Sequence, residues 1–294
     1  MNTHKSKLTP YLFIAPAIIL LAIFTFLPII IALGISFTDM GLVGLANWDS
    51  VNFIGLDNFV RLFQDDVFLK AMVNTLFYVV IGVPLAVLSS FVIALALSNV
   101  SNWMSNTFRV VYYMPSITNI VAIAVVWGFL YNQEYGLFNY LLSTVDIDAV
   151  PWLNDPFIAK ISLIILAVWK SNGVSMLIFL AAIQSIPKTY YEAAEIDGAN
   201  WWHKLTKITL PSMRFATFFV VVTTLIGWLQ FFEEPFVMTN GGPLDGTVSI
   251  ALFIYQEGFQ YSEFGYGAAA SFVLFIIVIL ATLLQFKLRK KEVM

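Results

Sequence analysis

The chain has 294 residues, of which 60% are hydrophobic and only 11% are charged. Soluble domains carry about 25% charged residues, so this composition indicates a membrane protein and excludes an ordinary soluble domain. The net charge of −3 argues against a nucleic-acid partner, and the absence of cysteine excludes disulfides, thiolate metal sites and a cysteine nucleophile.

Several apolar runs are each long enough to cross a bilayer, which takes about 20 helical residues. They are residues 11–37, 72–97, 108–131, 158–183, 215–238 and 267–287. The first run is too long for a signal peptide and lacks a small-residue cleavage site, so we expect it to remain as a span. The sequence therefore predicts an all-α, polytopic membrane protein with six transmembrane helices embedded in lipid.

The distribution of charge predicts which ends of the spans face inward. One set of connecting segments holds 11 of the 15 basic residues: Lys5, Lys7, Arg109, Lys188, Lys204, Lys207, Arg214, Lys287, Arg289, Lys290 and Lys291. The opposite segments hold 14 of the 18 acidic residues. Because basic residues concentrate on the cytoplasmic side, we expect both termini, and the segment between the fourth and fifth spans, to be cytoplasmic.

The first external loop and two prolines carry local predictions. Asp57 is expected to cap a short helix whose Phe59, Leu62 and Phe63 share one face at the membrane surface. Pro28 and Pro84 lie inside spans and are expected to kink them.

The fourth span contains a lysine, Lys170, about ten residues from either end. A charge at this depth costs at least about 2.5–3.5 kcal/mol, so it must face a polar interior or find a partner. Two interpretations remain open: a structural ion pair, or the wall of a translocation pathway. Glu233 and Glu234, after the fifth span, are either solvated at the outer rim or partners of Lys170.

The segment between the fourth and fifth spans has strong helix signals. Thr189 and Glu192 have the spacing of a capping box, and Gly198 suits the left-handed residue that ends a helix. Asn200 is expected to cap a second helix running from Trp201 to about residue 208, with Leu210 and Pro211 closing the loop. We therefore predict a helix, a turn and a second helix.

The fifth span places polar and aromatic groups together. Thr223, Gly227, Gln230 or Phe231, and Glu234 recur every three or four residues, which puts them on one helical stripe beside Thr224 and Trp228. Gln230 is suited to hydrogen-bond a hydroxyl-rich solute and Trp228 to stack on it, although such a stripe also suits packing alone. The Thr239–Pro243 sequence, Thr-Asn-Gly-Gly-Pro, predicts a tight turn.

Two of these segments resemble a known family. Residues 192–194 (Glu-Ala-Ala), 197–199 (Asp-Gly-Ala) and 208–211 (Ile-Thr-Leu-Pro) are similar to the cytoplasmic loop of permease subunits of binding-protein-dependent ABC importers. Residues 239–243 are similar to the signature of the carbohydrate branch, which includes maltose and multiple-sugar permeases. The resemblance extends over residues 70–290; Met213 stands near where that family has a further proline.

The resemblance implies roles for particular residues. The cytoplasmic loop would be a coupling helix that docks on an ATPase subunit, through Glu192, Ala193, Ala194, Asp197, Gly198, Ala199, Leu210 and Pro211. The substrate pathway would be lined by Lys170, Ser171, Val174, Thr224, Trp228, Gln230, Phe231 and Glu234. The implied partners are a second permease subunit in a heterodimer, two ATPase subunits that bind ATP and Mg, and an external or periplasmic sugar-binding protein. The implied location is the inner cell membrane.

We expect the chain itself to have no catalytic site, cofactor or metal. It has no phosphate-binding loop, and its only histidines are His4 and His203, outside the spans. An ion-coupled secondary transporter is the alternative, but it predicts paired intramembrane carboxylates and inverted repeats that are not evident. The expected organisation is an N-terminal span and external loop (1–70), a permease core (71–287) containing the coupling loop (185–214), and a cytoplasmic tail (288–294).

Overall fold

A computed structural model describes residues 9–293, and the side chains of 11–289. Lys5, Lys7 and His4 therefore lie outside the described residues. Within the described part the regular elements are helices, and the one β contact is an antiparallel bridge between Thr38 and Phe53. The predicted all-α class is confirmed.

The chain divides into two compact units. One unit comprises Met1–Asp65 and Phe253–Phe275, and the other comprises Asp66–Leu252 and Ile276–Met294. Two helices, α14 (Ile250–Tyr255) and α15 (Phe264–Val293), contribute residues to both.

The first unit begins with an apolar helix whose side chains are nearly all exposed. It consists of α1 (Thr9–Leu21), a π-helical segment η1 (Ala22–Phe26) and α2 (Leu27–Ile35). The widened π turn directly precedes Pro28, which has no N–H to donate and crowds the preceding turn. The helix is continuous through Pro28 as one candidate span, Tyr11–Ile35, and the kink expected at Pro28 stays a prediction.

The external loop of this unit contains α3 (Leu42–Ala46), a 3₁₀ turn η2 (Trp48–Ser50) and α4 (Asp57–Leu62). The predicted cap at Asp57 is wrong, because Asp57 is the first helical residue and no side chain caps α4. The predicted shared face is also wrong: Leu62 is fully buried while Phe63 is 56% exposed. The buried Asn58 instead fixes the helix, since its Nδ2 donates to Ser36 O (3.0 Å) and Thr38 O (2.8 Å).

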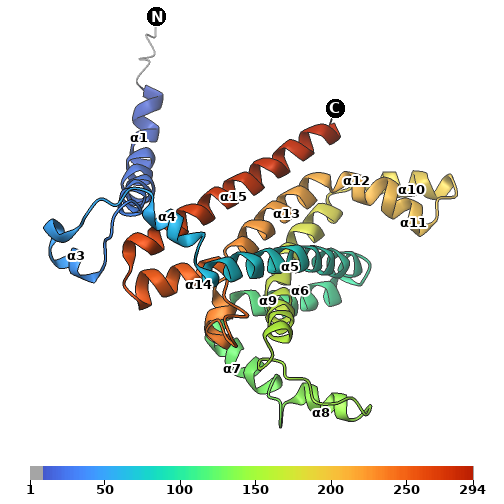
Figure 1. Ribbon diagram of the computed structural model, residues 1–294. Coiled ribbons are helices and arrows are strands. Elements are labelled where there is room, and N and C mark those ends of the chain that lie inside the picture. Colours follow the sequence, from blue (N-terminus) through green and yellow to red (C-terminus); the bar gives the residue numbers. More distant parts are fainter. Residues whose placement is uncertain (1–8, 294) are drawn as a thin grey trace, which may run out of the picture. The chain divides into compact units, whose positions relative to one another are not determined.

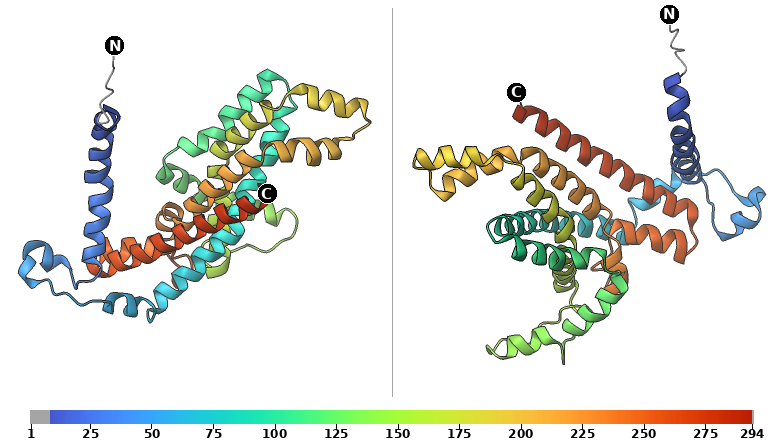
Figure 2. Two further views of the ribbon diagram at one scale, coloured as in Figure 1. Left: turned by 90° about the horizontal axis from the view of Figure 1, so that it is seen from above. Right: turned by 180° about the vertical axis from the view of Figure 1, so that it is seen from behind.

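The second unit is built around two long helices, α5 (Asp66–Ser98) and α9 (Pro156–Gln184), which pack along each other (Figures 1 and 2). Asp155 starts α9 by accepting hydrogen bonds from Phe157 N (2.9 Å) and Ile158 N (2.8 Å), and Pro156 fits the first turn, where no N–H donor is needed. Pro84 lies inside α5, which continues on both sides of it. The helices α6 (Asn102–Ile117) and α13 (Arg214–Leu229) pack on this pair.

The remaining elements are shorter. The helices α7 (Ile120–Leu130) and α8 (Leu137–Ser143) precede α9 in the chain. Following α9 come α10 (Lys188–Ile196), α11 (Trp201–Lys204), the π segment η3 (Leu205–Thr209) and α12 (Leu210–Ser212). Two further π segments are η4 (Pro235–Thr239) and η5 (Gln256–Gln260).

Four of the predicted spans are continuous helices, and two are not. Among the described residues, the helices long and apolar enough to cross a membrane are Tyr11–Ile35, Asp66–Ser98, Pro156–Gln184 and Phe264–Arg289. Two bent helix pairs raise the number to six if each pair is one span. The polytopic membrane architecture is therefore confirmed.

The predicted third span, 108–131, is broken. Its two helices, α6 and α7, meet at an angle of 99°. Pro115 lies in the last turn of α6, Thr118 is extended, and the side chain of Asn119 caps α7 by accepting from Val121 N (2.8 Å). The Asn119 cap thus begins a new helix, α7, inside the apolar run.

The predicted fifth span, 215–238, ends early. Its helix, α13, ends at Leu229, and Gln230 leaves the helical conformation. Pro235 is the first residue of η4 and has no N–H with which to bond the Phe231 carbonyl four residues earlier, so an uninterrupted helix through this position would leave that carbonyl without its helical donor. That carbonyl accepts from the hydroxyl of Ser249 instead.

Candidate functional site

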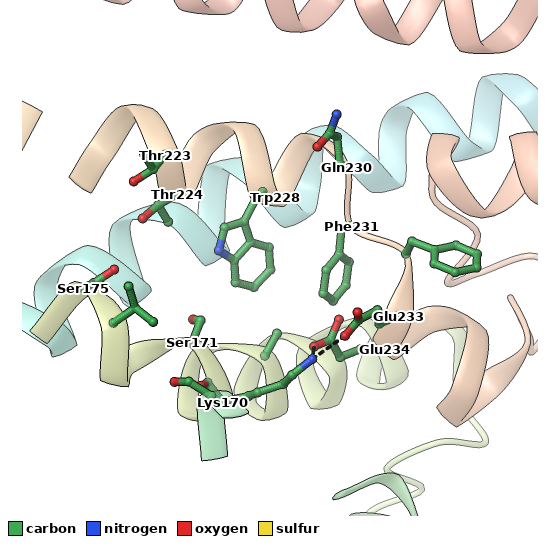
Figure 3. Close-up of a pocket in the computed structure, with 15 residues that line it drawn as sticks. Lys170, Ser171, Ser175, Thr223, Thr224, Trp228, Gln230, Phe231, Glu233 and Glu234 are labelled. Atoms are coloured by element: carbon green, nitrogen blue, oxygen red, sulfur yellow. Dashed lines mark hydrogen bonds and ion pairs between the residues drawn. The ribbon is translucent and has the colours of Figure 1, made fainter. Parts of the chain in front are cut away.

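A cavity of about 500 Å³ opens in the second unit between α9 and the end of α13 (Figure 3). Its lining comes from α6, α9, α13 and the segment that follows α13. The lining residues are Ser116, Ala167, Lys170, Ser171, Val174, Ser175, Thr223, Thr224, Gly227, Trp228, Gln230, Phe231, Phe232, Glu233 and Glu234. The structure thus gathers around one cavity all eight residues expected from the sequence to line a pathway.

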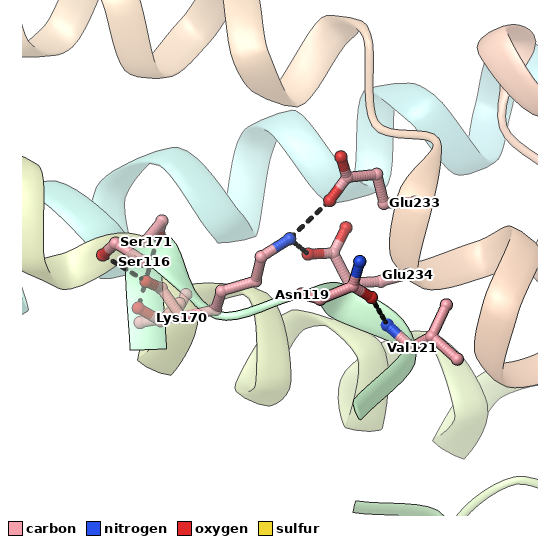
Figure 4. Close-up of polar contacts among 8 residues, drawn as sticks. Ser116, Asn119, Val121, Lys170, Ser171, Glu233 and Glu234 are labelled. Atoms are coloured by element: carbon pink, nitrogen blue, oxygen red, sulfur yellow. Dashed lines mark hydrogen bonds and ion pairs between the residues drawn. The ribbon is translucent and has the colours of Figure 1, made fainter. Parts of the chain in front are cut away.

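An ion cluster lies at this cavity (Figures 3 and 4). The ammonium of Lys170 is 2.5 Å from Glu233 Oε2 and 3.2 Å from Glu234 Oε1. The Lys170 and Glu234 side chains are 16% and 9% exposed, whereas Glu233 is 58% exposed. Lys170 therefore both pairs with carboxylates and lines the cavity, so its two interpretations are not exclusive. Of the two interpretations left open for Glu234, the structure shows pairing with Lys170 and not solvation at the rim, because the chain after Leu229 turns this carboxylate inward.

The helix turn around Lys170 is held by contacts with α5 and α6. Ser89 Oγ (2.8 Å) and Ser90 Oγ (3.1 Å) both donate to Asn172 Oδ1, which is buried. Ser116 Oγ donates to the Lys170 carbonyl (2.7 Å). The backbone of α6 approaches Gly173 so closely that an added Cβ would lie 2.6 Å from Tyr112 O. The position of Lys170 is therefore fixed by both neighbouring helices.

The aromatic side chains differ in how much surface they offer. Trp228 is only 5% exposed: its ring packs against Gly82 and stacks on Phe231, with centroids 5.0 Å apart. The free stacking face expected at Trp228 is therefore largely covered. Gln230 is exposed, and Phe232 is partly exposed and stacks on Phe236. Ser116, Ser175 and Phe232 line the cavity but were not predicted, because no local pattern marks them.

The turn after this segment is anchored to α5. Asn240 and Gly241 have positive φ values of 48° and 88°, as the Asn-Gly-Gly sequence suggests. The Thr247 hydroxyl bonds to Thr239 Oγ1 (2.7 Å) and Gly242 O (2.8 Å), which closes the turn. Asn74 Nδ2 donates to Asp245 O (3.1 Å) and Val248 O (2.9 Å). These contacts attach to α5 the turn that follows Glu233 and Glu234.

The loop between α9 and α13 forms the predicted pair of helices. Figure 1 shows α10 and α11 lying together beyond the ends of α9 and α13, and Lys204 Nζ bonds to Glu195 Oε1 (2.8 Å). Gly198 has φ +76°, Ala199 N donates to Ala194 O, and Gly198 N donates to Glu195 O, which together make a Schellman cap. Asn200 caps α11 by accepting from His203 N (2.9 Å). The predicted turn is therefore present.

Two details of this loop differ from the prediction. The capping box of Thr189 and Glu192 does not form, because α10 begins at Lys188 with Pro187 before it and no side-chain cap. Pro211 does not close the loop: it lies in the first turn of α12, where its missing N–H is tolerated, and the chain bends by 68° after Ser212.

The outer surface of this loop is rich in exposed groups. The predicted residues Glu192, Ala193, Asp197, Gly198, Leu210 and Pro211 are exposed, and Ala194 and Ala199 are partly exposed. Ile196 is 88% exposed and Trp201 and Trp202 are 58% and 61% exposed. A hollow of about 350 Å³ lies among Ala194, Asp197, Gly198, Ala199, His203, Lys207 and Ile208. The loop thus carries exposed apolar side chains and a hollow on the same short helical segment.

Comparison with known proteins agrees with this arrangement. The family described as "Binding-protein-dependent transport system inner membrane component" matches residues 66–292. The chain belongs to this family. The resemblance noted in the loop and in the Asn-Gly-Gly-Pro turn is confirmed, and with it a multi-pass transport component rather than an ion-coupled secondary transporter.

Relatives of the permease match over nearly their full length. The probable ABC transporter permease protein YurN of Bacillus subtilis (strain 168) is 35% identical, covering 98% of each chain. The lactose transport system permease protein LacF of Rhizobium radiobacter is 34% identical, covering 97% of each chain. Among solved structures, a bacterial ABC transporter involved in the import of the acidic polysaccharide alginate matches with a TM-score of 0.79 and 26% identity, covering 96% of this chain and 95% of that chain.

Proposed function

We propose that this permease forms one half of the sugar pathway of an ATP-driven importer. The observation that carries the proposal is the connection of the Lys170 cavity, through α9, to the exposed α10–α11 loop. Only Ser185–Pro187 separate the end of α9 from the start of α10. A displacement of the loop is thereby transmitted to the helix that carries Lys170.

The chemistry of the cavity supports a neutral, hydroxyl-rich solute. Hydroxyls of Ser171 and Thr224 and the amide of Gln230 both donate and accept hydrogen bonds, as sugar hydroxyls do, whereas the Ser116 hydroxyl donates to the Lys170 carbonyl and is left as an acceptor. Each bond left unmade costs about 1–3 kcal/mol, so such a lining favours sugars over apolar solutes. Two relatives have names that mention sugars: the lactose permease LacF, and the arabinooligosaccharides permease AraP of Bacillus subtilis (strain 168), which is 32% identical.

In this proposal the permease pairs with a second permease subunit and receives sugar from an external binding protein. The α10–α11 loop docks on one of two ATPase subunits, which bind ATP and Mg. Ala193 and Ala194 allow close approach, Gly198 sets the turn, and Ile196, Trp201 and Trp202 contribute apolar contact. Both termini lie in the cytoplasm, and the divisions at residues 70 and 287 remain predictions.

Uptake by the reconstituted complex in vesicles tests the proposal. Gly198 has open space around its Cβ position within this chain, so a substitution there acts on the fold of the loop through its positive φ. Val and Asn add side chains of similar size at the proposed docking surface, so the difference between them reports the backbone conformation. We expect Gly198→Val, which disfavours that conformation, to lose ATP-dependent uptake and ATPase binding. Gly198→Asn tolerates the conformation and is the matched control, expected to retain both. Uptake by the permease without ATPase subunits or ATP would overturn the proposal.

A further inference from the structure

A second cavity, of about 270 Å³, lies on the side of α6 and shares no residue with the Lys170 cavity. It is lined by Arg109, Val110, Tyr113, Met114 and Ile117 of α6 and by Leu177 of α9. Val110, Met114 and Ile117 are 63%, 53% and 68% exposed, so this is an open groove with apolar walls. Arg109 supplies the one charge among its lining residues, at the end nearer the start of α6.

Arg109 has no partner among the described residues. Its Nε is buried without a hydrogen-bond partner, and no ion pair involves its guanidinium. Ser105 Oγ, one helical turn earlier on α6, is also buried and unpartnered. By contrast, Arg61 pairs with Glu263 at 2.6 Å and Arg289 lies over the ring of Phe218 at 4.5 Å. The polar end of the groove therefore lacks an anion.

The level of Arg109 in the helix bundle suits a lipid headgroup. The stretch from Asn102 to Arg109 is largely polar, and apolar residues follow at once. Leu177, which lines the groove with Arg109, is about 10 Å from the end of α9 at Gln184, at 1.5 Å of rise per residue. The side chain of an arginine there can reach the membrane interface, and placing its charge beside apolar groups costs free energy unless an anion pairs with it.

We propose that this groove binds an anionic phospholipid. The lipid phosphate accepts hydrogen bonds from the guanidinium of Arg109, and one acyl chain lies along Val110, Met114 and Ile117. The guanidinium has several N–H donors that match phosphate oxygens. The apolar wall begins directly beside it, as the acyl chains of a lipid begin directly beside the headgroup. Phosphatidylcholine carries the same phosphate but also a choline cation, which would be repelled by the guanidinium, so the net charge of the headgroup separates this occupant from a zwitterionic lipid. The site does not depend on which solute the permease carries.

Native mass spectrometry of the purified complex, titrated with phosphatidylglycerol or phosphatidylcholine, tests the site. We expect tight phosphatidylglycerol binding that Arg109→Gln weakens by about tenfold or more, and no such loss for phosphatidylcholine. Arg109→Lys retains the charge and is expected to retain part of the binding. Met114→Trp fills the groove without touching the charge and is expected to displace the same lipid, whereas Val125→Trp, on the exposed side of α7, is the matched control.

Two results would overturn the proposal. One is phosphatidylglycerol binding that is unchanged in both Arg109→Gln and Met114→Trp. The other is a cysteine at Val110 that cross-links to the second permease subunit in the assembled complex, because that subunit would then occupy the groove. If Arg109→Gln assembles poorly, Met114→Trp still decides between these outcomes, since it leaves the charge in place.

Discussion

Lys170 shows how one side chain depends on the pairing around it. Its ammonium and the nearly buried carboxylate of Glu234 are 3.2 Å apart, while Glu233 completes the cluster from a more exposed position. A buried ion pair is costly to break from one side, because the remaining charge is left uncompensated. The three residues therefore form an unequal cluster, in which the Lys170–Glu234 pair is the sensitive part.

Removing the charge of Lys170 should destabilise the permease more than removing that of Glu233. We expect Lys170→Met to lower stability by about 3–5 kcal/mol and to abolish uptake, since Glu234 loses its partner. Glu233→Gln should cost under about 1 kcal/mol, because its side chain is largely solvated. Thermal unfolding of the complex measures both effects. The double variant Lys170→Met/Glu234→Gln should recover much of the stability, and its failure to do so would contradict the pairing.

Glu257 predicts a pH dependence in the first unit. Burial, together with the nearby carboxylates of Glu263 and Asp65, raises its pKa from 4.5 to about 7, although Arg61 opposes the shift. The folded unit then holds a proton that the unfolded chain releases, so stability falls as pH rises from about 4.5 to about 7. Protection factors for amide exchange of residues 253–275 in the complex, which remove the intrinsic acceleration of exchange with pH, should be higher at pH 5 than at pH 8. Glu257→Gln should flatten this dependence, and an unchanged dependence would exclude Glu257 as its source.

At the scale of elements, close helix contact and helix breaks shape the cavity. The α6 backbone crosses α9 at Gly173, and α13 ends at Leu229, before Pro235 opens the next helical segment. The first feature brings Ser116 to the Lys170 carbonyl, and the second turns Glu234 toward its ammonium. The expected helical stripe from Thr223 to Glu234 is thus replaced by a helix followed by a turn, although its members still meet at one cavity.

A methyl group at Gly173 should separate α6 from α9. An added Cβ would lie 2.6 Å from Tyr112 O and 2.7 Å from Ser116 Oγ, so backbone must move. We expect Gly173→Ala to cost about 1–3 kcal/mol and to reduce uptake, as measured by unfolding and transport assays. Gly128→Ala in α7, where the Cβ meets nothing within 4 Å, should be neutral or slightly stabilising. Equal stability of the two variants would contradict the close contact.

At the scale of the whole molecule, the proposed mechanism requires one orientation in the bilayer. The segment from Pro156 to Gln184 must have its start outside and its end inside, so that the α10–α11 loop meets the ATPase side. The charge distribution supports this orientation through the positive-inside rule. If the loop lay outside, the Lys170 cavity would have no link to ATP hydrolysis.

The absence of cysteine makes the orientation directly measurable. Glu134→Cys and Glu192→Cys place single thiols at exposed positions, before and after α9 respectively. In intact cells a membrane-impermeant maleimide should label the first and not the second. Permeabilised cells should show both labelled, which controls for reactivity. The reverse pattern in intact cells would invert the topology and refute the coupling role of the loop.

The sequence alone determined the membrane class, the family, four of the spans and the turn at Gly198. These follow from composition, run length and conformational preferences that are properties of the chain itself. The break in the third span has local signals, Pro115 and the Asn119 cap, which a count of apolar residues overlooks. Only the tertiary structure decided how the Phe231 carbonyl is satisfied where the fifth span breaks, that Trp228 is packed rather than free, and that Glu234 pairs with Lys170. Those outcomes depend on Ser249 and Gly82, which lie far from their partners in the sequence. An argument from local periodicity assumes a continuous helix. It cannot include a hydrogen bond such as the one from the Ser249 hydroxyl to the Phe231 carbonyl, because the two residues are 18 positions apart.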